Sequence, residues 1–194
     1  MLPEAQGYEK ASGPGRLIVV VGPSGVGKDS LLAASRDTLQ ACPNLLLVRR
    51  TITRVASGDA EDHEPMSEAA FVAAEREGAF CFTWRAHGLC YGLRSELETH
   101  LAAGKPAIVN GSRKVLADMA VRFPGLAVVR VTADPHVIAA RLASRGRESA
   151  GEIEARLARA AEIPNVAPVA VVDNSGALKD GARLFSKAVA AFLS

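Results

Sequence analysis

The feature that most constrains this chain is a glycine-rich turn placed between an apolar strand and a helix. Residues 17–21 read Leu-Ile-Val-Val-Val, a β-branched run typical of a strand buried on both faces of a parallel sheet. A turn follows at residues 22–28, and Lys28 to Ala41 has a helical pattern. Glycines let backbone N–H groups point at phosphate oxygens, while the helix N-terminus and a lysine add positive charge. The sequence therefore predicts a phosphate-binding loop made of Gly22, Pro23, Ser24, Gly25, Val26, Gly27 and Lys28.

The residue after the lysine departs from the usual P-loop pattern. P-loops carry Ser or Thr at this position as a Mg²⁺ ligand, whereas this chain has Asp29 followed by Ser30. A carboxylate can hold Mg²⁺ directly or through water, since hard cations take oxygen ligands. Alternatively, Asp29 is an acid favoured by the helix dipole, and Ser30 or water serves the metal. Both interpretations stay open, and Asp29 and Ser30 are the candidate metal ligands.

Strand-like and helical segments alternate along most of the chain, which predicts an α/β fold with a parallel sheet. The expected strands lie at residues 17–21, 45–48, 107–109, 126–131 and 169–172, and the later helices at 114–122, 135–144, 152–162 and 178–193. Residues 49–103 break this rhythm with a capped helix at 68–77 and a hairpin that turns near His87-Gly88. We expect this segment to be a lobe inserted into one domain, and residues 1–15 to be a flexible tail.

Composition excludes several partners. The chain has 194 residues, which suits a single domain, and its net charge of +2 is too small for a protein that neutralises many nucleic-acid phosphates. Its longest strictly apolar run is far shorter than the ~20 residues that cross a bilayer. We therefore expect a cytoplasmic protein that binds small molecules, without nucleic acid or membrane, and we leave a homodimer open. The excess of Arg over Lys fits either phosphate recognition or the base composition of the genome.

Several motifs in a fixed order resemble the guanylate kinase superfamily over about residues 16–175. They are Gly22 to Lys28, Thr51-Ile52-Thr53-Arg54, Gly58 to His63, Phe80 to Trp84, Tyr91-Gly92 and Arg141-Leu142 to Arg147. The resemblance implies a P-loop NTPase fold of nucleoside monophosphate kinase type within residues 16–194. In that fold we expect a core at 16–48 and 104–194, an acceptor-binding lobe at 49–103, and a short lid at about 144–151.

The residues that guanylate kinases use to read guanine are absent. Thr83 stands where the family has a glutamate, and Asn110-Gly111-Ser112-Arg113 stands where it has an acidic pair. Polar discrimination of this kind is worth orders of magnitude, so its loss argues against a guanine acceptor. Arg49-Arg50 replaces small hydroxyl residues at the start of the lobe, which suits an acceptor with no base and more phosphate. Five motifs carry a closer resemblance: Gly-Pro-Ser-Gly-Val-Gly-Lys-Asp-Ser at 22–30, Arg-Arg-x-Ile-Thr-Arg at 49–54, Ala-His-Gly-x-x-Tyr-Gly at 86–92, Asn-Gly-Ser-Arg at 110–113 and Arg-Gly-Arg-Glu at 145–148. Together they resemble the ribose 1,5-bisphosphate phosphokinases, which make 5-phosphoribosyl 1-diphosphate (PRPP) from ATP during phosphonate use.

This resemblance implies ATP and Mg²⁺ bound at residues 22–30, and a guanylate or other nucleoside monophosphate kinase remains the alternative. A phosphate acceptor is already ionised, so positioning and charge neutralisation, without a general base, would carry the transfer. The candidate catalytic residues are Lys28, Arg141, Arg145 and Arg147, although a solvated helix end also explains the three arginines. The candidate acceptor-binding residues are Arg50, Arg54, His63, Tyr91, Asn110, Ser112 and Arg113. Which of Arg49, Arg50 and Arg113 contacts the second phosphate stays open.

Overall fold

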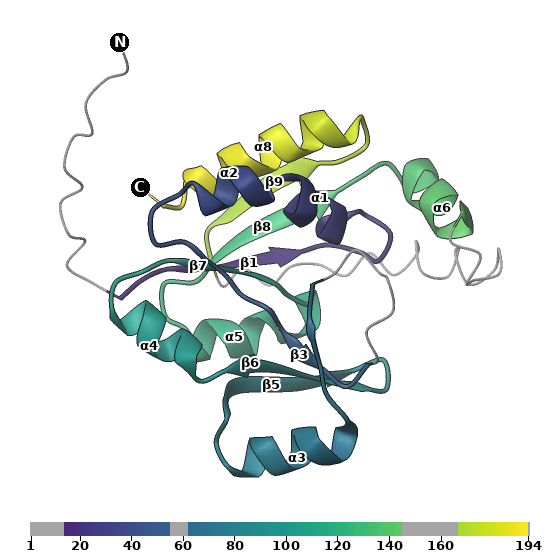
Figure 1. Cartoon of the computed structure of the whole chain (residues 1–194). Helices are drawn as coiled ribbons and strands as arrows, with labels where there is room; N and C mark the ends of the chain where they lie inside the picture. The colour runs from purple at the N-terminus through teal and green to yellow at the C-terminus, as the bar shows by residue number, and fades with distance from the viewer. Residues whose placement is uncertain (1–13, 55–61, 145–166, 194) are drawn as a thin grey trace.

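The computed structural model describes residues 14–54, 62–144 and 167–193. Its larger sheet is parallel and has the strand order β2-β7-β1-β8-β9 (Figure 1). The phosphate-binding loop leaves the central strand, so the residues that end the neighbouring strands surround it. The strands are β1 Leu17–Val21, β2 Leu46–Leu47, β7 Ala107–Asn110, β8 Ala127–Thr132 and β9 Val169–Asp173.

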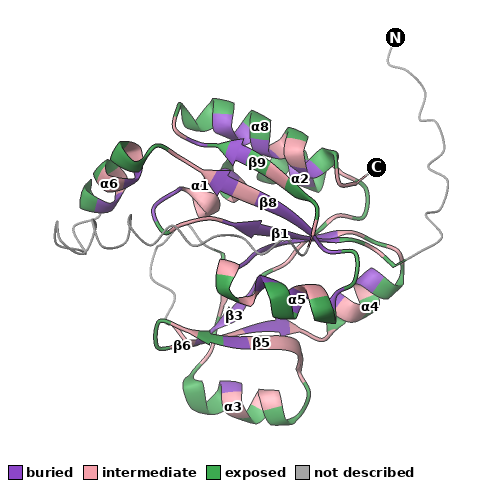
Figure 2. Cartoon of the chain, turned by 180° about the vertical axis from the view of Figure 1, so that it is seen from behind, coloured by how far each residue is buried: buried purple, intermediate pink, exposed green. Residues whose placement is uncertain are grey.

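Alternate residues of β1 are buried on opposite faces of this sheet, as the unbroken apolar run predicts. Figure 2 shows β1 in the colour of buried residues. Ile18 and Val20 pack against one set of helices, namely α1 Lys28–Ala34, α2 Arg36–Gln40, α6 Pro135–Ser144 and α8 Leu178–Ala190. Leu17 and Val19 pack against the other set, namely α4 Glu96–Ala102 and α5 Leu116–Arg122, the latter preceded by the 3-10 turn η1 Arg113–Val115.

The smaller sheet lies within the segment expected to be the inserted lobe, and it has the order β4-β3-β6-β5. Its strands are β3 Thr51–Ile52, β4 Glu64–Pro65, β5 Phe80–Ala86 and β6 Leu89–Arg94, and α3 Glu68–Arg76 lies beside it. The expected hairpin is confirmed, with its turn at His87 (φ 52°) and Gly88 (φ 73°). Ser67 caps α3 by accepting a hydrogen bond from Ala70 N.

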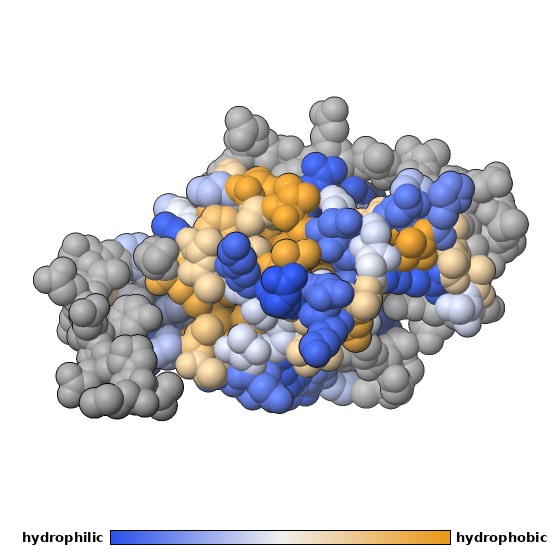
Figure 3. All heavy atoms as spheres, turned by 90° about the horizontal axis from the view of Figure 1, so that it is seen from above, coloured by the Kyte–Doolittle hydropathy of each residue, from blue (hydrophilic) through white to orange (hydrophobic). Residues whose placement is uncertain are grey.

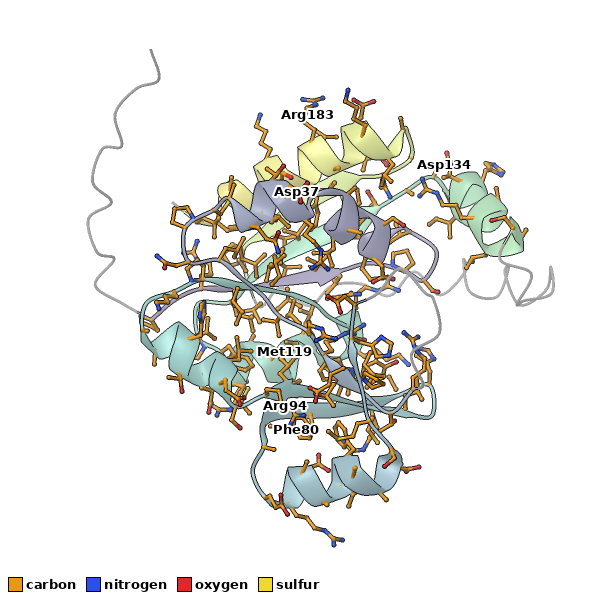
Figure 4. The ribbon with its side chains drawn as sticks, in the orientation of Figure 1. Asp37, Phe80, Arg94, Met119, Asp134 and Arg183 are labelled. Atoms are coloured by element: carbon orange, nitrogen blue, oxygen red, sulfur yellow. The ribbon has the colours of Figure 1, made fainter. Side chains whose placement is uncertain are left out.

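Aromatic side chains hold this lobe together and join it to the core. The guanidinium of Arg94 lies over the ring of Phe80, 5.1 Å from its centroid, and both residues are labelled in Figure 4. Trp84 and Leu93 belong to the same buried cluster as Val19 and Met119 of the core. The position of the lobe relative to the phosphate-binding loop is therefore fixed by apolar burial.

One expected helix is divided, and one helix was missed. The helix expected at residues 28–41 is divided at Ser35, whose backbone (φ −97°, ψ 0°) leaves the helical region between α1 and α2. The Ser35 side chain is 1% exposed and its hydroxyl donates to Ala182 O of α8 at 3.3 Å. The helix α4 was not expected at all. The helix expected at 152–162, most of the expected lid and residues 1–13 of the tail lie outside the described residues.

The face that carries α8 mixes hydrophilic and hydrophobic side chains, as Figure 3 shows from above. On α8 itself, Phe185 and Val189 are buried while Leu178 and Leu184 stay exposed. Within the described part of the chain, no helix is both long enough and apolar enough to span a membrane.

Candidate active site

The phosphate-binding loop runs from the end of β1 to the start of α1, as the sequence predicts. Gly25 (φ 81°) and Gly27 (φ 92°) lie in the left-handed region, which side-chain-bearing residues rarely adopt. Lys28 Nζ lies across the loop and donates to Gly22 O at 3.0 Å and to Pro23 O at 3.1 Å. A cation and a helix N-terminus thus converge at one loop, which is the arrangement that binds phosphate.

Two side chains from distant parts of the sequence hold the loop at the carbonyl of Val26. Asn174, which follows β9 and is 2% exposed, donates through Nδ2 to Val26 O at 2.8 Å. Arg141 of α6 donates to the same oxygen at 3.2 Å and to Asn174 O at 2.9 Å. A Cβ on Gly27 would lie 2.6 Å from Asn174 Nδ2, so this position has no room for a side chain. The loop conformation therefore depends on β9 and α6 as well as on its own glycines.

The sequence placed Arg141 among lid arginines, and the structure places it on α6 against the loop. Arg145 and Arg147 lie outside the described residues. Asn174 was missed, although its position was visible in the sequence: it is a polar residue soon after the expected strand at 169–172, at the carboxyl edge where open α/β sheets bind ligands.

Asp29 and Asn110 meet beside the loop, from the first turn of α1 and the end of β7. Asp29 Oδ1 accepts a hydrogen bond from Asn110 Nδ2 at 2.5 Å. Asn110 is 8% exposed, and its Oδ1 has no hydrogen-bond partner among the residues described. The amide oxygen of Asn110 and the carboxylate of Asp29 are both hard oxygen ligands, the kind that Mg²⁺ prefers.

The donor set around Asp29 fits Mg²⁺ rather than a metal caged by protein. The described residues contain no group of three or more His, Cys, Asp or Glu side chains that could hold a metal. Mg²⁺ commonly takes one or two carboxylates and keeps water and substrate phosphates as its other ligands. Asp29 and Asn110 Oδ1, with Ser30 in the same first turn, fit that habit.

A cavity of about 350 Å³ opens beside Asp29 and Asn110, between the α1–α2 pair and β2. Three arginines line it, namely Arg36, Arg49 and Arg50. The sequence identified Arg50 and left Arg49 open, but it gave no indication of Arg36, which lies on α2 outside every motif. The cavity thus joins the candidate metal ligands to a cluster of positive charge.

Arg50 is buried against two stacked aromatic rings of the lobe. Its guanidinium carbon lies 5.2 Å from the centroid of Tyr91 and 5.9 Å from that of Trp84. The two rings are nearly parallel, with centroids 5.0 Å apart. Cation–π contacts of this kind strengthen when they are desolvated, so the rings fix the position of Arg50 at the cavity wall.

The remaining candidates lie in the lobe, at His63, and in the core after β7, at Ser112 and Arg113. His63 is buried, with Nε2 3.4 Å from Arg54 O, so a hydrogen bond within the lobe accounts for its position. Ser112 Oγ accepts from Lys114 N and begins η1. Burial lowers the pKa of Arg113, and the positive charge of Arg130 lowers it further.

Comparison with known proteins identifies the family. No protein-family model matches the sequence. The chain is 48% identical over 171 residues to the ribose 1,5-bisphosphate phosphokinase PhnN of Pseudomonas paraeruginosa, covering 87% of this chain and 92% of that protein. It is 50% identical over 147 residues to the protein of the same name from Acidiphilium cryptum, covering 76% and 78%.

The fold is similar to that of a guanylate kinase from Anaplasma phagocytophilum, with a TM-score of 0.63. The similarity covers 92% of this chain and 86% of that one at 15% sequence identity, so it shows the fold alone. It agrees with the expected P-loop fold of nucleoside monophosphate kinase type. With relatives nearly half identical over most of their length, this chain belongs to the ribose 1,5-bisphosphate phosphokinase family.

Proposed function

We propose that the chain transfers the γ-phosphoryl group of ATP to the 1-phosphate of ribose 1,5-bisphosphate, forming PRPP and ADP. An oxygen of the 1-phosphate attacks the γ-phosphorus, and the bond from that phosphorus to the β–γ bridging oxygen breaks. The observation that carries the proposal is the composition of the acceptor cavity, where three arginines surround the space next to Asp29 and Asn110. Family membership supports the same reaction, and PRPP formation would place it in phosphonate use.

Each side chain in the mechanism either neutralises charge or fixes position. The attacking phosphate oxygen is ionised at neutral pH, so no residue has to remove a proton from it. Lys28, which lies on the carbonyls of Gly22 and Pro23, would turn to the transferring phosphates when ATP enters. Arg141 and Asn174 hold the loop in shape, and Arg145 and Arg147 remain proposed transition-state ligands.

The acceptor would lie between the lobe and the core. Arg50, Arg54, His63 and Tyr91 are proposed to bind it from the lobe. Asn110, Ser112 and Arg113 are proposed to bind it from the end of β7. When bound at Asp29, Asn110 and Ser30, Mg²⁺ would neutralise phosphate charge and orient the β- and γ-phosphates.

A guanylate kinase activity is the alternative, and the carboxylates near the cavity argue against it. Among the described residues that line the cavity, the carboxylates are Asp29, bound to Asn110, and Asp62, bound to two arginines. Thr83, at the position of the guanine-reading glutamate, has its hydroxyl hydrogen-bonded to Glu75 of α3 at 2.5 Å. Both carboxylates of the described lining are thus already engaged, and the position of the guanine-reading glutamate carries no carboxylate at all.

The test is an acceptor assay with the purified chain, ATP and Mg²⁺. Ribose 1,5-bisphosphate, GMP and AMP are supplied in parallel, and ³¹P NMR follows the new diphosphate. We expect PRPP from the bisphosphate and little turnover of either nucleotide. Good turnover of GMP with no PRPP would overturn the proposal, and full activity in excess EDTA would remove Mg²⁺ from it.

We also propose that the protein works in the cytoplasm on small molecules and does not bind nucleic acid. The net charge of +2 gives little counterion release on DNA or RNA, so no retardation is expected in a gel-shift assay. Light scattering would measure whether the chain forms the homodimer that the sequence leaves open.

A further inference from the structure

The acceptor cavity extends well beyond the reacting groups. Asp29 and Asn110 line it where it meets the phosphate-binding loop, and Arg36 of α2 and Asp62 also line it. Arg36 is the first residue of α2, eight residues after Lys28, which begins α1. A cavity of about 350 Å³ lies within the range of small-ligand sites. One ligand can therefore contact both the reacting groups and α2.

Two arginines are arranged around one carboxylate in this cavity. Arg36 Nη2 lies 3.2 Å from Asp62 Oδ2, and Arg49 Nε lies 2.8 Å from Asp62 Oδ1. Arg49 Nη2 also donates to His63 O at 3.1 Å. Within the described part of the chain, these contacts leave Nε and Nη1 of Arg36 and Nη1 of Arg49 as donors for a ligand. Asp62 thus orients both guanidinium groups without using all their N–H donors.

Stability alone does not account for this arrangement. The side chains of Arg36 and Asp62 are each 45% exposed, and that of Arg49 is 57% exposed. Ion pairs at such exposure contribute little to folding, because water screens them and ordering the side chains costs entropy. The arginine fork, in contrast, matches the geometry of a phosphate and gives paired, charge-assisted hydrogen bonds.

We propose that Arg36 and Arg49, oriented by Asp62, bind the 5-phosphate of the acceptor. The 1-phosphate then lies at Asp29 and Asn110, where the transfer takes place. This proposal rests on the proposed function and identifies the residues that select a bisphosphate over a monophosphate. It also answers which of the arginines at the start of the lobe contacts the second phosphate: Arg49, together with a partner on α2.

The test removes Arg36 by mutation and the 5-phosphate by a change of substrate, each separately. KM and kcat are measured for Arg36→Gln and the wild type with ribose 1,5-bisphosphate and with ribose 1-phosphate, which lacks the distal group. We expect KM for the bisphosphate to rise by about 10- to 100-fold in Arg36→Gln, the usual range for a hydrogen bond between charged groups. KM for ribose 1-phosphate and for ATP should stay at the wild-type values. Arg36→Lys should recover only part of the loss, because lysine keeps the charge but not the fork.

Arg122→Gln is the matched control. Arg122 is 48% exposed and paired with Glu98, but it lies at the end of α5, outside the cavity. Its loss should leave every KM unchanged. A readout independent of turnover is the fluorescence of Trp84, the single tryptophan, on titration with ribose 5-phosphate. The guanidinium of Arg50 lies over the Trp84 ring, so ligand binding in the cavity should change the emission of Trp84. In Arg36→Gln, a higher ligand concentration should be needed for the same change.

The outcomes separate the two proposals. A wild type that makes PRPP, with an Arg36→Gln variant of unchanged KM for the bisphosphate, overturns the role of Arg36 and leaves the function intact. An equal rise in KM for both sugars also overturns it, since the effect would not depend on the 5-phosphate. A wild type that makes no PRPP overturns the proposed function, and the role of Arg36 with it.

Discussion

Replacing Asn174 by alanine tests whether its hydrogen bond to Val26 O keeps the phosphate-binding loop in shape. Val26 O accepts from Asn174 Nδ2 at 2.8 Å and from Arg141 Nη1 at 3.2 Å. In the variant, the carbonyl keeps only the longer hydrogen bond, from Arg141. Loss of one buried hydrogen bond lowers the free energy of unfolding by about 0.5–1.5 kcal/mol. The vacated space adds to this loss, while removal of Oδ1, which has no partner among the described residues, offsets part of it. We expect a net destabilisation of about 1–2 kcal/mol.

The same change should weaken ATP binding, because the loop would no longer be ordered before the nucleotide arrives. If the free energy of ATP binding weakens by the same 1–2 kcal/mol, KM for ATP rises by about 5- to 30-fold. Urea unfolding and steady-state kinetics measure the two effects. Ser35→Ala is the matched control, since it removes a buried hydrogen bond to Ala182 O on another side of α1. It should lower stability and leave KM for ATP unchanged.

The reasoning is refuted if Asn174→Ala loses stability while its KM for ATP stays at the wild-type value. The pair Asn174→Ala and Arg141→Met adds a second check on the shared carbonyl. Because both side chains donate to Val26 O, their effects on unfolding should not add, with a coupling of about 0.5 kcal/mol or more.

Three further predictions concern the loop and the lobe. Lys28→Ala should abolish PRPP formation without unfolding the chain, and a fully active variant would remove the lysine from the mechanism. The hydrogen bond from Arg94 holds the pKa of Glu64 below its ordinary 4.5, so the pair stabilises the fold above that pH and the contribution is lost as the pH falls below it. Urea midpoints at about pH 6 and pH 3 should therefore differ less in Glu64→Gln than in the wild type. Gly92→Val should lower the free energy of unfolding by about 1–3 kcal/mol, and with it the melting temperature, because a Cβ there would lie 2.6 Å from the Phe80 ring. An unchanged melting temperature would show that the ring moves aside freely.

Elements with a strong local signal could be predicted from the sequence. The strand at 17–21 and the helix at 135–144 have the bounds expected of them. The strand is a pure β-branched run. The helix begins at a proline after Asp134, whose carboxylate accepts from His136 N at 2.8 Å. The missed helix α4 also had a local signal, because Leu97 and Leu101 are spaced by four and are buried.

The break at Ser35 could not be predicted, since the hydroxyl there donates to a carbonyl 147 residues away in the sequence. The same is true of Arg36, whose role depends on its contact with Asp62. The place of Asn174 after a strand was visible in the sequence, but its hydrogen bond to Val26, 148 residues earlier, was not. Motifs record residues that are close in sequence, whereas these contacts exist only after the sheet has brought its strands together.

The position of β1 in the sheet has a consequence for how the chain is made. Leu17 pairs with Ala107 and Ile18 with Ala127, so the most apolar strand finds its neighbours only after about another hundred residues have been synthesised. At about 5–20 residues per second on the ribosome, this strand waits for roughly 5–20 s before it can pair. During that time Leu-Ile-Val-Val-Val is an unprotected β-prone segment. Slowing translation between residues 21 and 107 should therefore increase aggregation of the nascent chain, while slowing it after residue 132 should not.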